Sequence, residues 1–85
     1  MSGERRELDA RGLICPIPVL KARKVLLSLP ENAVLTVQAT DANAPADFKL
    51  FCHEQGYTLV SVTAVAGGFE IVVTKKPCQR ATPDR

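Results

Sequence analysis

The stretch Leu13-Ile14-Cys15-Pro16-Ile17-Pro18-Val19-Leu20 decides the fold, because it places a cysteine where a strand-like segment gives way to a helix. Proline fixes φ near the helical value, so Pro16 predicts a helix that begins there with Cys15 as its N-cap. Pro18 is tolerated in the same turn, because the carbonyl that its ring would meet belongs to Ile14, outside the helix. The stretch therefore predicts a cysteine at the amide-rich start of a helix.

The predicted helix start is expected to stabilise the thiolate form of Cys15. The free N–H groups of a first turn and the helix macrodipole both favour an anion, and the amides of Ile17 and Val19 are the expected donors. Such a site stabilises an anion by about 0.3–1 kcal/mol, and by up to about 2 kcal/mol in favourable cases, which lowers a thiol pKa of about 8.5 by a fraction of a unit to about one and a half units and predicts a Cys15 pKa near or slightly above ~7. The alternative is that Cys15 fills the strand–helix corner as a small apolar residue. The flanking prolines favour the reactive thiol.

Hydrophobic periodicity extends the prediction outward from this stretch. It predicts strands over residues 7–10, 34–40, 57–66 and 69–75, with helices over 16–29 and from near Pro45 to about Gln55. The first helix is expected to bury one stripe made of Val19, Ala22, Leu26 and Leu29, widened by Leu20, Leu27 and Val25. The second is expected to bury Ala44, Phe48, Phe51, Cys52 and Gln55. Gly67-Gly68 predicts a two-residue hairpin turn.

The element order is β-α-β-α-β-β. Crossovers between parallel strands are right-handed, so both helices are expected on one face of a four-stranded sheet, and the last hairpin adds an antiparallel pair. The fold class is therefore an α+β two-layer sandwich with a mixed sheet. We expect one domain over residues 1–76 and a flexible tail over residues 77–85.

Composition restricts the function. The 85-residue chain is 46% hydrophobic with a net charge of +2, so neither direct nucleic-acid binding nor a membrane span is expected. The polar N-terminus lacks a secretory core, which favours the cytoplasm. Three cysteines without short spacing predict neither a disulfide framework nor a zinc site, and no cofactor is expected.

Other residues receive weaker assignments. Lys21 and Lys24 lie on the solvent face of the first predicted helix and are candidates for partner recognition. Asp41 and Asp47 flank the start of the second helix, as caps or as a polar recognition edge. His53 is expected in solvent, Cys52 in the core and Cys78 exposed in the tail.

Leu8-Asp9, Gly12-Leu13 and Cys15-Pro16-Ile17-Pro18-Val19 together resemble the signature of the TusA/SirA-like sulfur carrier family. The resemblance extends over residues 7–75, through Asp41, Asp47, Phe51-Cys52 and Gly56. It implies that Cys15 carries sulfur as a persulfide, with Asp9, Gly12, Pro16 and Pro18 as the supporting motif.

The resemblance also implies partners. A cysteine desulfurase or a rhodanese-type protein would load Cys15, and a downstream relay protein would receive the sulfur for tRNA thiolation, cofactor synthesis or sulfur oxidation. Such a carrier transfers a group without turning over a substrate alone, so it is not expected to be an enzyme, and a monomer is expected.

Two alternatives from other function classes stay open. In one, Cys15 is structural and the chain is a binding or regulatory module that docks through its sheet or its Lys21/Lys24 face. In the other, the chain is a thiol-redox enzyme, although no Cys-x-x-Cys pair supplies a resolving thiol.

Overall fold

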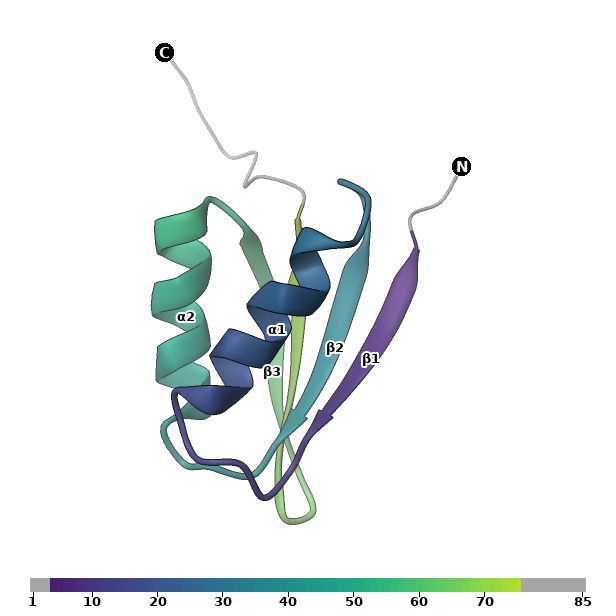
Figure 1. The fold of residues 1–85 in the computed structure, drawn as a ribbon. Helices are drawn as coiled ribbons and strands as arrows, with labels where there is room; N and C mark the ends of the chain where they lie inside the picture. The colour runs from purple at the N-terminus through teal and green to yellow at the C-terminus, as the bar shows by residue number, and fades with distance from the viewer. Residues whose placement is uncertain (1–3, 76–85) are drawn as a thin grey trace.

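The computed structural model describes residues 4–75 and contains the six elements in the predicted order (Figure 1). Their bounds are β1 (Arg5–Ala10), α1 (Ile17–Leu27), β2 (Val34–Ala39), α2 (Ala44–Gln55), β3 (Thr58–Val65) and β4 (Gly68–Thr74). The predicted tail and Cys78 lie outside the described residues. Within residues 4–75, no helix is long and apolar enough to span a membrane.

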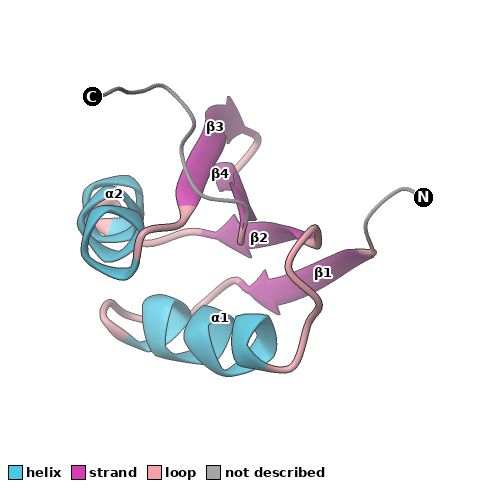
Figure 2. Ribbon diagram, turned by 90° about the horizontal axis from the view of Figure 1, so that it is seen from above, coloured by secondary structure: helices cyan, strands magenta, loops and turns pink. Residues whose placement is uncertain are grey.

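The four strands form one mixed sheet in the order β1-β2-β4-β3. β1 pairs with β2 in parallel, whereas β2 with β4 and β3 with β4 pair antiparallel. Seen from above, both helices lie on the same face of the sheet (Figure 2). The predicted two-layer α+β fold is confirmed.

The core lies between the helices and this face of the sheet. Along β2 the alternate residues Leu35, Val37 and Ala39 are buried, as the two-residue period of a strand requires. The helices contribute Ala22 and Leu26 from α1, and Ala44, Phe48, Phe51 and Cys52 from α2. The prediction that Cys52 belongs to the core is therefore confirmed.

Two predicted parts of the apolar stripes are wrong. Leu20 and Leu27 are 58% and 59% exposed, because they project from the side of α1 that faces away from the sheet. Gln55, at the end of α2, is also exposed. The sequence period identified the helices but overstated the width of their buried faces.

The hairpin between β3 and β4 turns at Ala66-Gly67, one residue earlier than predicted. Gly67 takes the positive φ that the tight turn needs. Gly68 already belongs to β4 and lies against the backbone of β2, where an added Cβ would collide with the carbonyl oxygen of Ala39. The two glycines thus serve different purposes, since one shapes the turn and the other permits close packing.

Candidate functional site

Cys15 lies in the loop between β1 and α1, at the end of the molecule where this loop meets the loop between β2 and α2 (Figure 1). Two long-range hydrogen bonds join the loops. The Gly12 amide donates to Thr40 Oγ1 at 2.9 Å, and the Cys15 amide donates to Asp41 Oδ2 at 2.7 Å. The position of the cysteine is therefore set by residues far away in the sequence.

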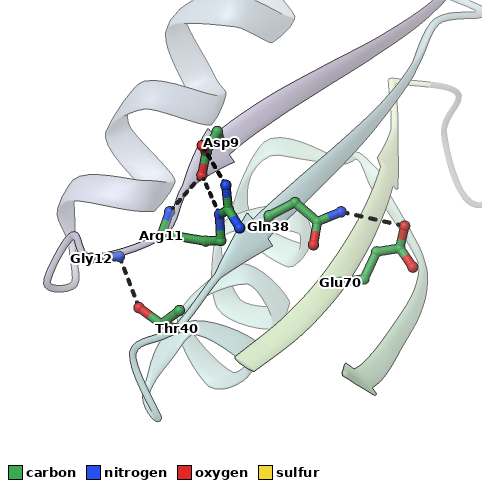
Figure 3. A network of polar contacts seen from close by, with 6 residues as sticks. All are labelled: Asp9, Arg11, Gly12, Gln38, Thr40 and Glu70. Carbon is green, nitrogen blue, oxygen red and sulfur yellow. Dashed lines mark hydrogen bonds and ion pairs between the residues drawn. The ribbon is translucent and has the colours of Figure 1, made fainter. Parts of the chain in front are cut away.

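Asp9 shapes the beginning of the cysteine loop. Its carboxylate accepts hydrogen bonds from the Arg11 backbone amide at 3.1 Å and from the Arg11 guanidinium at 2.9 and 3.1 Å (Figure 3). These bonds, the side-chain one foremost, lower the pKa of Asp9 to about 2. Gly12 follows with a φ of 81°, a conformation that side-chain-bearing residues rarely adopt. Asp9, near the end of β1, and Gly12, in the turn that follows, are two residues of the predicted motif, and both precede Cys15 at this end of the strand.

Asp41 connects the two loops through both of its carboxylate oxygens. Oδ1 accepts from the Asn43 amide at 2.9 Å, while Oδ2 accepts from Cys15. The two backbone donors, that of Asn43 first, lower the pKa of Asp41. The carboxylate therefore stays ionised and holds a fixed negative charge beside the cysteine.

The helix start differs from the prediction. The N-cap is Pro16 rather than Cys15, and α1 begins at Ile17. The Ile17 amide donates to the Ile14 carbonyl at 2.9 Å, so it is engaged by the backbone instead of pointing freely at the sulfur. Cys15 precedes the N-cap by one residue, and of the two predicted donors only the Val19 amide is left as a candidate. Pro18 occupies the first turn and is fully buried.

The prediction that the pKa of Cys15 is lowered to near or slightly above ~7 is wrong. Partial burial, a hydrogen bond to the Asp47 side chain, and the charges of Asp47 and Asp41 raise the pKa of Cys15 to about 12. The tertiary structure brings both carboxylates to the sulfur, and together with burial they outweigh the modest effect expected of a helix start. At neutral pH the side chain is consequently a neutral thiol whose S–H donates to Asp47.

A groove of about 220 Å³ runs between the two helices beside this thiol. Its lining is mostly apolar, with carboxylates on the α2 side, and consists of Pro16, Val19, Asp47, Leu50, Phe51 and Glu54. Ile14, next to Cys15, is 72% exposed. Sequence analysis had identified Asp47 but had not identified Leu50 or Glu54. Their spacing of three and seven residues from Asp47 along a helix was the available signal.

The remaining candidates lie apart from the thiol. Lys21 and Lys24 are exposed on α1, as predicted, and no ion pair involving them is seen within residues 4–75. His53 is exposed and lines a separate surface hollow with Ala46, Lys49 and Leu50. Over the same described part of the chain, no cluster of three or more His, Cys, Asp or Glu residues could hold a metal ion. The site is therefore one thiol, two nearby carboxylates and an apolar groove.

Comparisons with known proteins identify the family of the chain. The model of the family described as "Sulfurtransferase TusA" matches residues 6–75. A Neisseria meningitidis serogroup A protein is 45% identical over 69 residues, which cover 81% of this chain and 93% of that protein. The sulfur carrier protein TusA of Allochromatium vinosum is 39% identical over 70 residues, covering 82% and 92% of the two chains.

The fold has a matching solved structure. The crystal structure of a SirA-like protein from Desulfitobacterium hafniense superimposes with a TM-score of 0.75 at 27% identity, covering 84% of this chain and 97% of that one. The family match and the relatives span the strands, both helices and the cysteine loop. On this evidence the chain belongs to the TusA family of sulfur carrier proteins.

Proposed function

We propose that Cys15 accepts sulfane sulfur as a persulfide and passes it to the thiol of an acceptor protein. The observation that carries the proposal is the position of Cys15: it lies partly exposed at the junction of two loops, beside an apolar groove, in a chain of the sulfur carrier family. Cys52, by contrast, is only 3% exposed.

The proposed transfer exchanges one sulfur–sulfur bond for another. The Cys15 thiolate attacks the outer sulfur of the donor persulfide, a new bond forms to Cys15 Sγ, and the donor cysteine leaves as a thiolate. The proton that Cys15 gave up passes to the departing thiolate through solvent. An acceptor thiolate then attacks the same outer sulfur and releases Cys15, so no net oxidation occurs. The chain carries a group and needs partners for every transfer.

A cysteine desulfurase or a rhodanese-type protein is the proposed donor, and a relay protein of tRNA thiolation, cofactor synthesis or sulfur oxidation is the proposed acceptor. The cytoplasm, where such relays work on reduced thiols, is the proposed location.

Intact-mass measurement after incubation with a cysteine desulfurase and cysteine tests the proposal. The wild-type chain should gain the mass of one sulfur atom, and dithiothreitol should remove it. Cys15→Ser should gain nothing, while a Cys52→Ala control should load like the wild type. Equal loading of Cys15→Ser and the wild type would refute the proposal and leave the binding-module alternative, in which Cys15 is structural.

A further inference from the structure

The groove beside Cys15 combines an apolar lining with carboxylates along one edge. Pro16 and Val19 form the side nearer α1, and Leu50 and Phe51 continue this apolar lining from α2. Asp47 lies about one helical turn before Leu50 and Phe51, and Glu54 lies about one turn after them, so both place carboxylates along the α2 edge. The groove therefore offers an apolar floor with negative charge on one side.

Exposed apolar side chains are found in the cysteine loop and on both helices. Ile14, next to Cys15, is 72% exposed, Ile17 and Leu20 on α1 are 43% and 58% exposed, and Leu50, which lines the groove, is 56% exposed. Exposed apolar residues that gather next to a reactive group are typical of a protein-docking surface. The core needs none of these side chains, since it is filled by other residues of the same helices.

Charge decides what kind of partner fits. Two of the residues that line the groove are acidic and none is basic within residues 4–75, and Asp41 adds a further carboxylate next to the cysteine. An acidic or purely apolar partner would leave these charges unpaired or opposed on contact, which costs free energy. A partner with a cationic side chain next to an apolar one could pair with the carboxylates and pack against the apolar lining at the same time.

We propose that the groove binds an apolar segment of a sulfur-relay partner that carries an arginine or lysine, and that this cation pairs with Asp47 beside Cys15. The proposal rests on the proposed carrier function, because it identifies the partner of that same site.

Such pairing would couple docking to chemistry. A positive charge next to a thiol favours its ionised form, and a cation bound to Asp47 also weakens that carboxylate's hold on the thiol proton. Cys15 would then become a nucleophile where a partner with the right charge is seated. Small thiols and disulfides met in solution would react slowly with it, and the sulfur would be protected between partners.

Thiol–disulfide exchange with charged peptides tests the docking chemistry without a natural partner. The probes are short leucine-containing peptides whose single cysteine carries a thionitrobenzoate leaving group, and they differ only in having arginine, glutamine or glutamate next to that cysteine. The Cys15 thiolate attacks the peptide cysteine, a peptide–Cys15 disulfide forms, and coloured thionitrobenzoate leaves while the thiol proton goes to buffer. Peptide mapping confirms that Cys15 is the residue modified.

The wild-type chain should react about two- to five-fold faster with the arginine peptide than with the glutamate peptide, the range expected for one exposed charge pair. Added salt and the Asp47→Asn change should each bring this ratio toward one. Glu54→Gln should reduce it less, since Glu54 lies farther along the groove. Glu31→Gln, a matched control in the turn between α1 and β2, should leave the ratio unchanged.

A ratio near one in the wild type, or one unaffected by Asp47→Asn, would overturn the docking proposal. Self-association of the wild type that Asp47→Asn abolishes would also overturn it, by assigning the groove to a second copy of this chain. Sulfur loading from the desulfurase separates the two proposals. If Cys15 is loaded with sulfur but the arginine and glutamate peptides react at equal rates, only the proposal of a cationic partner is refuted. If the peptide rates differ but no sulfur is loaded, the carrier function is refuted.

Discussion

Cys15 and Cys52 both have a raised pKa, but for different reasons. Burial alone raises the pKa of Cys52 to about 11, and Cys52 belongs to the buried core cluster. Partial burial acts on Cys15 too, but there the carboxylates of Asp47 and Asp41 add to it. A partner can offset charge, whereas it cannot reach a thiol inside the core. The cause of a pKa shift therefore distinguishes a thiol that a partner can activate from a buried one better than the magnitude of the shift does.

Replacing each cysteine in turn should have the largest effects, because one variant should lose sulfur loading and the other should lose stability. Cys15→Ser should abolish sulfur loading and leave the melting temperature nearly unchanged. Cys52→Ser should load normally but lose about 1–3 kcal/mol of unfolding free energy, because a hydroxyl replaces a thiol in an apolar environment. Loading measured by mass and unfolding measured by urea titration check both. Loss of loading in a folded Cys52→Ser protein would contradict the assignment.

Apolar side chains of the two regions should also differ in their effect on stability. Phe48 is fully buried between α2 and the sheet, so Phe48→Ala should cost about 3–5 kcal/mol. Ile14 is mostly exposed, so Ile14→Ser should change stability by no more than about 0.5 kcal/mol. Urea unfolding of both variants measures the difference. A large loss for Ile14→Ser would show that this residue supports the fold rather than the docking surface.

Removing the negative charge next to Cys15 should increase the difference in pKa and in alkylation rate between Cys15 and Cys52. Asp47→Asn should lower the pKa of Cys15 below about 12, because the variant loses a negative charge beside the sulfur. Below the pKa the thiolate fraction falls ten-fold per unit, so alkylation of Cys15 at neutral pH should speed up by about ten-fold for each unit of decrease. The rate should rise with pH in both proteins.

Cys52 serves as the internal control in this experiment. Burial sets its pKa, so its alkylation should stay slow in the wild type and in Asp47→Asn alike. Iodoacetamide labelling followed by peptide mapping resolves the two cysteines. An unchanged or slower Cys15 rate in the variant would show that Asp47 does not hold the thiol proton.

The smallest expected effect concerns the loop contact made by Asp41. Asp41→Ala removes the acceptor for the Cys15 and Asn43 amides, so the cysteine loop should open more often while the sheet stays intact. Amide hydrogen exchange should accelerate at Cys15 and remain unchanged at Val37 in the core. Unaltered protection at Cys15 would mean that other contacts are sufficient to hold the loop.

The sequence was sufficient for the fold because the fold depends on local periodicity. The two-residue period of residues 35–39 and the helical spacing of Phe48 and Cys52 predict which sides face the core, and both were confirmed. The exposed positions of Leu20 and Leu27 could not be predicted, because exposed apolar residues can follow the same helical spacing as a core stripe.

The chemistry of the site depends on contacts between distant residues. The sequence indicated Cys15, Asp41 and Asp47, yet nothing in their spacing showed that the loop before α2 and the first turn of α2 would bring both carboxylates to the sulfur. The hydrogen bond from Ile17 to Ile14 likewise shifts the helix start by one residue and removes an expected donor. Local rules predicted a lowered pKa for Cys15, whereas burial and the long-range contacts with Asp47 and Asp41 raise it.

Peptide-level mass spectrometry of the desulfurase-loaded wild-type chain, with the persulfide trapped by alkylation, tests the central claim most directly. The account predicts that the additional sulfur is found on the peptide containing Cys15 and is absent from the peptides containing Cys52 and Cys78. Sulfur located on either of those peptides, with Cys15 unmodified, would contradict it.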